Sequence, residues 1–94
     1  MMTFSILATY DSKAECFHTP FFLPNDAMGE RVFRQMCQDP DHQFSLNPED
    51  YTLFNIGTYN DQDGSIQSTP ATAIINGIQA TQGQENITEI AANA

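Results

Sequence analysis

The stretch Tyr51-Thr52-Leu53-Phe54-Asn55-Ile56-Gly57-Thr58-Tyr59, YTLFNIGTY in one-letter code, decides the fold of this chain. It is rich in aromatic and β-branched residues, and apolar side chains occur at both odd and even positions. This composition is typical of a β-strand, and apolar residues on both faces are typical of a strand inside a sheet. We therefore predict a central strand over residues 51–59.

Residues 3–10 predict a second strand, because apolar side chains alternate there with more polar ones. One side, which we expect to face the core, consists of Phe4, Ile6, Ala8 and Tyr10. After a turn at Asp11-Ser12, another extended segment is predicted over residues 14–22. Pro20 has no backbone N–H, so it places this segment at an edge of the sheet or ends it early.

A helix is predicted to begin after Asn25, whose side chain can cap it. It should end at Asp39, because Pro40 disfavours helical geometry in the residue before it. The side chains at helical spacing form one apolar stripe: Met28, Val32, Phe33, Met36 and Cys37. This stripe predicts one helix packed against the sheet.

The second half of the chain predicts a hairpin. Residues 60–64 form a tight loop in which Gly64 is free to adopt a positive φ. The chain should return as a short strand over residues 65–67, and residues 72–78 can add a further short strand.

Together these segments predict an α+β fold, with a small, mainly antiparallel sheet of about four strands and one helix on one face. Residues 1–78 are expected to form a single domain. Residues 79–94 are rich in Gln, Thr, Asn and Ala, so we expect a flexible or disordered tail.

The charge of the chain restricts its partners. Three basic residues stand against twelve acidic ones, and the net charge is −9. Nucleic acids and anionic membranes both attract clustered cations, so neither is expected as the main partner. A basic protein partner remains open. The N-terminal residues lack the pattern of a signal peptide, and no apolar run is long enough to span a bilayer.

No pattern for catalysis or cofactor binding is present. The chain has no glycine-rich phosphate loop, no nucleophile elbow and no carboxylate pair with an apolar flank. Asp61-Gln62-Asp63-Gly64 resembles part of a calcium loop, but aligning Gly64 with the glycine of that loop puts Tyr59 and Pro70 at ligand positions. We therefore predict a non-enzymatic protein without a cofactor, catalytic residues or a metal site.

Cys16 and His18 lie two residues apart, so on a strand they would point the same way, as a zinc pair requires. A structural zinc site needs four ligands, however, and Cys37 and His42 lack a paired spacing. We predict that Cys16 and Cys37 are reduced thiols in a cytoplasm.

Aromatic and basic residues are concentrated between residues 13 and 34. Together they could stack and neutralise single-stranded nucleic acid. This candidate partner-binding or single-stranded-DNA-binding site consists of Lys13, Phe17, Phe21, Phe22, Arg31 and Arg34. Acidic neighbours such as Glu15 and Glu30 cancel the local charge, so we favour packing of the phenylalanines in the core and at a sheet edge.

The order of four motifs resembles the small non-structural protein of gokushoviruses, which are Microviridae, tailless bacteriophages with single-stranded DNA genomes. The motifs are YDSKAE at 10–15, PFF at 20–22, NPEDYTLFNIG at 47–57 and DGSI at 63–66. The positions that make the match are Asp11, Ser12, Lys13, Glu15, Pro20, Phe21, Phe22, Asp50, Tyr51, Leu53, Phe54 and Gly57. The resemblance covers about residues 4–67 and brings no catalytic residues.

The resemblance implies a protein of the host bacterial cytoplasm that assists or regulates synthesis or packaging of the viral single-stranded DNA genome. Because the chain is acidic, we expect it to act through contacts with a viral replication or procapsid protein. Two alternatives stay open: a direct single-stranded-DNA-binding protein, and a capsid-associated structural protein. We also expect a homodimer through the edge strand 14–22, since an unpaired edge can accept a strand from a second copy.

Overall fold

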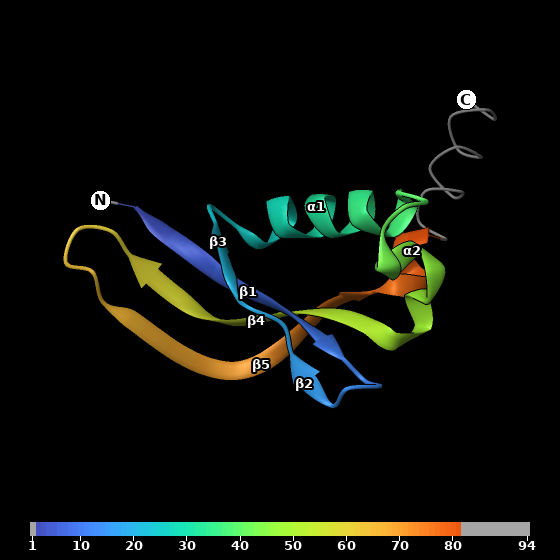
Figure 1. The fold of residues 1–94 in the computed structure, drawn as a ribbon. Helices are drawn as coiled ribbons and strands as arrows, with labels where there is room; N and C mark the ends of the chain where they lie inside the picture. Colours follow the sequence, from blue (N-terminus) through green and yellow to red (C-terminus); the bar gives the residue numbers. More distant parts are fainter. Residues whose placement is uncertain (1, 82–94) are drawn as a thin grey trace, which may run out of the picture.

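The computed structural model describes residues 2–81 and confirms the predicted α+β fold: one antiparallel sheet of five strands with its helices on one face (Figure 1). The strands are β1 (Thr3–Asp11), β2 (Cys16–Phe17), β3 (Phe21–Leu23), β4 (Tyr51–Asn60) and β5 (Ile66–Asn76). The helices are α1 (Asp26–Gln38), α2 (Gln43–Leu46) and the 3₁₀ turn η1 (Pro48–Asp50).

The order of strands in the sheet is β2-β1-β4-β5, and β3 also pairs with β1. Every pair is antiparallel. The predicted central position of the YTLFNIGTY segment is confirmed, because β4 is paired with β1 on one side and with β5 on the other.

The predicted division of residues 65–78 into two short strands is wrong, because β5 runs without a break from Ile66 to Asn76. Its pairing with β4 shifts register twice. At the second shift, residues 69–71 lie opposite Ile56 alone, since Asn55 pairs with Thr72 and Gly57 with Ser68. Pro70 lies in this bulge, where it does not have to donate to the ladder, so one strand can continue through it.

Helix α1 begins and ends where its sequence predicts. Asn25 is the N-cap, and its side chain accepts a hydrogen bond of 2.9 Å from the Met28 backbone N–H. Asp39 is the C-cap. No helix among residues 2–81 is long and apolar enough to cross a membrane.

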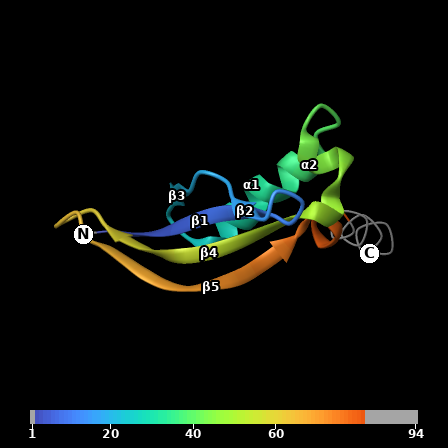
Figure 2. The same ribbon diagram turned by 60° about the horizontal axis from the view of Figure 1, so that its bottom comes forward.

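The core lies between α1 and the sheet. Its buried members come from β1, β4, β5, both helices and the turn after β5: Leu7, Phe33, Cys37, Phe44, Tyr51, Leu53, Ile75 and Ala80. Figure 2 shows α1 and α2 on the same side of the strands. Gly29 permits the close approach of α1 to β1, because a Cβ at this position would overlap the Leu7 side chain.

Residues 77–81 form a helical turn after β5. Ala80 is fully buried, and its carbonyl oxygen accepts hydrogen bonds from Arg34 and Gln38 of α1. The first residues of the predicted tail, 79–81, are thus part of the folded unit, and the rest of it, 82–94, lies outside the described residues.

Candidate functional site: the aromatic sheet face

The two faces of the sheet have different surroundings. On β1, Leu7 points toward α1, where it meets Gly29, and Thr9 is buried beside Val32 and Met36. Because side chains alternate along a strand, Phe4, Ile6, Ala8 and Tyr10 point to the opposite face. The expectation that this apolar side faces the helix-covered core is therefore wrong, and among the described residues no helix covers it.

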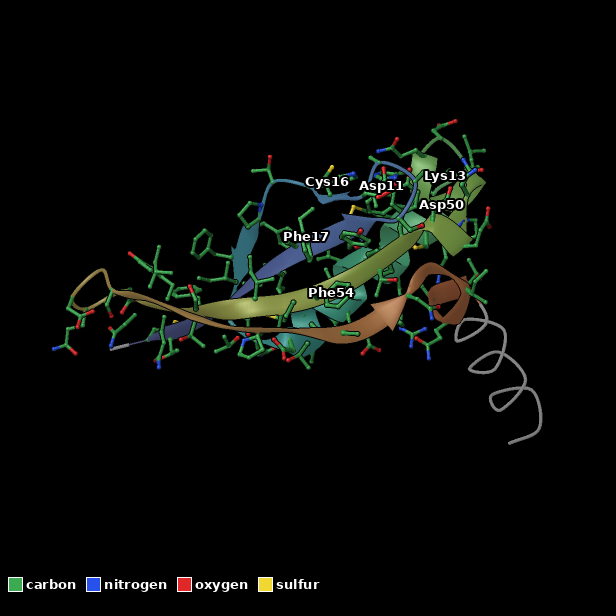
Figure 3. The ribbon with its side chains drawn as sticks, turned by 90° about the horizontal axis from the view of Figure 1, so that it is seen from below. Asp11, Lys13, Cys16, Phe17, Asp50 and Phe54 are labelled. Carbon is green, nitrogen blue, oxygen red and sulfur yellow. The ribbon has the colours of Figure 1, made fainter. Side chains whose placement is uncertain are left out.

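One group of three rings lies on this open face near the end of β1. Tyr10, Phe17 and Phe54 come from β1, β2 and β4 and contact each other edge to face, with ring centroids 5.0 to 6.4 Å apart. Figure 3 shows Phe17 and Phe54 on the side of the sheet away from α1. Rings in this geometry stabilise each other beyond the area they bury.

A second group of rings lies at the other end of the same face. Tyr59 of β4 contacts Phe4 of β1 at a centroid distance of 5.9 Å and Phe22 of β3 at 5.5 Å. Ile6 and Ala8 lie between the two groups and are buried. We call these eight residues the aromatic face: Phe4, Ile6, Ala8, Tyr10, Phe17, Phe22, Phe54 and Tyr59.

Part of the aromatic face is exposed. Phe17 and Phe22 have 44 % and 45 % of their surface accessible, and Ile66, which pairs with Tyr59 from β5, has 62 %. Large apolar side chains that are grouped and exposed mark interaction sites on folded proteins. The aromatic face is thus the candidate binding surface of this domain.

The predicted site residues are divided between the two sides of the sheet. Phe17 and Phe22 belong to the aromatic face. Lys13 lies in the turn between β1 and β2, at the Tyr10 end of this face (Figure 3). Phe21 points the other way and packs against the core. Arg31 and Arg34 are on α1. The guanidinium group of Arg34 forms an ion pair with Glu30, with 3.0 Å between Nη2 and Oε2.

Sequence reasoning missed four of the rings, namely Phe4, Tyr10, Phe54 and Tyr59. The signal for Phe4 and Tyr10 was present in the alternating apolar positions of residues 3–10, and that for Phe54 in the even apolar positions of the central strand. Tyr59 is at an odd position and reaches this face because the pairing with β1 shifts register at Ile56. What the sequence does not specify is which side of the sheet the single helix covers.

Carboxylates lie at both ends of the aromatic face. At the Tyr10 end, Lys13 and Glu15 lie in the turn between β1 and β2, and the Asp50 backbone carbonyl accepts a hydrogen bond from Ser12 N–H in this turn. Figure 3 shows Lys13 and Asp50 close together there. Asp11 follows Tyr10 on β1 and points to the helical side, where its carboxylate lies 3.7 Å from His18 Nε2. It also accepts hydrogen bonds from the backbone N–H groups of Lys13 and Ala14.

At the Tyr59 end, the loop between β4 and β5 carries Asp61 and Asp63. Asp61 accepts a hydrogen bond of 2.8 Å from the Met2 backbone N–H. Asp63 accepts one from the Ser65 backbone N–H, which lowers the pKa of its carboxyl group. Acidic residues therefore lie at each end of the aromatic face.

A pocket of about 400 Å³ lies on the helical side, beside the gap between β2 and β3. Its wall includes Phe44 with His18 and His42 against it, at ring-centroid distances of 5.9 and 4.4 Å. His42 Nδ1 accepts a hydrogen bond from the Phe44 backbone N–H. No group of three or more His, Cys, Asp or Glu residues within residues 2–81 is arranged to hold a metal ion.

Both cysteines are free in the structure. Cys16 is exposed on β2, whereas Cys37 is buried in the core, and burial raises the pKa of its thiol to about 11. A thiol that stays protonated at neutral pH is a poor nucleophile and a poor metal ligand. Cys37 therefore serves packing.

The fold and this site define a class of protein: a small α+β domain with one sheet face covered by helices and the other left open and aromatic. The chain belongs to the Phage ORF5 protein family, whose sequence model matches residues 4–80. This match identifies it as a bacteriophage protein and includes every strand except the first residue of β1. No curated protein and no solved structure matches the chain.

Proposed function

We propose that this phage protein is a non-enzymatic adaptor of gokushoviruses, within the Microviridae. It assists or regulates synthesis or packaging of the viral single-stranded DNA genome in the host cytoplasm. It acts through protein contacts made by the aromatic face.

The observation that carries this proposal is the exposure of Phe17 and Phe22, one in each of the two ring groups of the aromatic face. A small domain gains stability by covering such side chains. Exposed aromatic side chains contribute less to the stability of the domain than covered ones, so their exposure indicates that another molecule covers them during function. The other site candidates, the histidine pocket and the single exposed thiol, bring together fewer groups.

The charges around the aromatic face favour a protein rather than DNA as the molecule that covers it. Single-stranded DNA on the aromatic face would need cations next to its phosphates. Only Lys13 lies at the edge of this face, because Arg31 and Arg34 are on α1 on the other side of the sheet. The same phosphates would lie near the acidic ends of the face, so repulsion would oppose binding.

A direct single-stranded-DNA-binding protein is the second candidate, since six rings on an open antiparallel sheet could stack several bases. A fluorescence-anisotropy titration of a labelled oligonucleotide, at low and at near-physiological salt, separates the two candidates. If the protein is an adaptor, we expect no saturable binding of the oligonucleotide at either salt concentration. Saturable binding of the oligonucleotide that weakens as the salt concentration rises would contradict the adaptor function and support direct DNA binding.

A positive test of the adaptor uses the purified initiator and procapsid proteins of the phage. Binding to one of them should be lost in Phe17→Ala and Phe22→Ala. It should be retained in Leu46→Ala, a matched control because Leu46 is an equally apolar, exposed residue on α2. Equal binding by all three variants would contradict the proposed role of the face.

The expected homodimer through residues 14–22 is a separate proposal. Within this segment only Cys16 and Phe17 of β2 and Phe21 and Phe22 of β3 are strand, so little continuous edge is available to a second copy. Light scattering at high micromolar concentration tests it, and a monomer there would count against it.

A further inference from the structure

We infer that the partner of the aromatic face is a basic protein segment with an apolar centre and positive side chains at both ends. This inference rests on the proposed function, because it names the chemistry that an adaptor with this face selects. Three features of the described residues support it: the apolar centre, the charges at its ends and the distance between them.

The centre of the face selects apolar side chains. Ile6 and Ala8 form its buried floor, and the rings of Phe17 and Phe22 stand at its β2 and β3 edge with nearly half of their surface exposed. Aromatic and aliphatic anchors are the groups that gain most from such a surface.

The ends of the face select cations. Glu15 and Asp50 lie at the Tyr10 end, and Asp61 and Asp63 lie at the Tyr59 end. The single cation among them, Lys13, leaves both ends with net negative charge. Oppositely charged groups at the rim of an apolar centre orient a partner and speed its association.

The distance between the acidic ends sets the length of the partner. β1 runs from Thr3 to Asp11 along the whole face. A strand of this length spans about 27 Å. The partner must place its cations about as far apart, which takes about 18 residues in a helix or about eight in an extended chain.

The same charges argue against the other molecules that an apolar surface can bind. A lipid surface and single-stranded DNA are anionic, and so is a second copy of this chain, with its net charge of −9. In a symmetric dimer of two aromatic faces, acidic ends would meet acidic ends. A basic segment is the occupant that both the centre and the ends favour.

Synthetic peptides test the inference directly. The chain contains no tryptophan, so one tryptophan in the apolar centre of each peptide reports binding by its own fluorescence. The first peptide has two lysines at each end, the second has the same residues with all four lysines at one end, and the third has glutamate in place of lysine. We expect the first to bind about tenfold more tightly than the second and the third not to bind at micromolar concentration.

Variants of the protein show where the peptide binds. The pairs Glu15→Gln with Asp50→Asn, and Asp61→Asn with Asp63→Asn, should each weaken the first peptide severalfold. Asn retains a side-chain oxygen for the loop hydrogen bonds of Asp61 and Asp63. Asp41→Asn removes a charge between α1 and α2 on the helical side and should have no effect.

Equal binding of the first two peptides, or equal effects of Asp41→Asn and the end variants, would overturn the inference. Tight binding of the acidic peptide would overturn it as well. If the first peptide binds as expected but neither the phage initiator nor the procapsid protein competes with it, the inference stands and the proposed viral role fails.

Discussion

Phe17 and Phe54 belong to strands that are not neighbours, yet their rings meet above β1 with their centroids 5.5 Å apart. Ala8, which pairs with Phe54, is one of the four β1 residues on this face, and its small side chain leaves space for the two rings to approach. The open face is thereby packed like a partial core, although no helix among the described residues covers it.

Replacing Phe54 and Phe17 by alanine, one at a time, should distinguish the contribution of the rings to stability from their contribution to partner binding. Phe54→Ala removes contacts with both Tyr10 and Phe17 from a partly buried position, and should lower the free energy of unfolding by about 2 kcal/mol. Phe17→Ala, at a position with 44 % of its surface exposed, should cost less than about 1 kcal/mol but abolish partner binding. Urea denaturation and a binding titration measure the two effects. Equal losses of stability would contradict this division.

Gly57 is required by the close approach of β4 and β5. A Cβ there would overlap the backbone carbonyl oxygen of Gln67, which cannot move without displacing β5. Gly57→Ala should therefore destabilise the domain by about 2 kcal/mol. Gly29→Ala is the comparison, since its Cβ would meet only the end of the Leu7 side chain, and thermal melting should show the smaller loss for this variant.

The cap of α1 offers a milder test. Asn25→Ala removes the acceptor for the Met28 N–H and should cost about 1 kcal/mol in urea denaturation. Asn25→Asp retains a side-chain oxygen and places negative charge at the positive end of the helix dipole, so its stability should stay near that of the wild type. A loss in Asn25→Asp as large as in Asn25→Ala would show that the amide group acts in some other way.

Burial of Cys37 predicts a dependence of stability on alkaline pH. Its pKa is raised from the ordinary value of 9.0 to about 11, so between these values the unfolded thiol loses its proton while the folded one keeps it. Stability should therefore be fully present below about pH 9 and fall as the pH rises to about 11, by about 2 kcal/mol in total. Comparison with Cys37→Ala isolates this effect from the titration of tyrosines. Parallel pH profiles for the two proteins would refute it.

Local sequence features predicted much of the fold. The capped helix, the central strand and the loop glycine depend on neighbouring residues alone, and all three occur as expected: Asn25 caps α1, β4 is central, and Gly64 has φ +75°. The length of β5 was not predicted, because Pro70 ordinarily ends a strand. Here the register shift opposite Ile56 accommodates it.

The candidate site was less predictable for a physical reason. Alternation along β1 shows that two faces differ but does not show which one the helix covers. The β1 residues that face α1 are Leu7 and Thr9, and Thr9 is polar. The more apolar side of β1 is the one that no helix among the described residues covers. For the same reason the basic and aromatic residues between positions 13 and 34 looked like one site, although the sheet separates Arg31 and Arg34 from Phe17 and Phe22.

Each outer edge of the sheet contains a proline, Pro20 in the gap between β2 and β3 and Pro70 in the bulge of β5. Fibrils grow when identical edges pair in register over many chains, and a residue without an N–H interrupts that growth. The two prolines therefore oppose edge-to-edge aggregation of a domain that exposes aromatic side chains on one face.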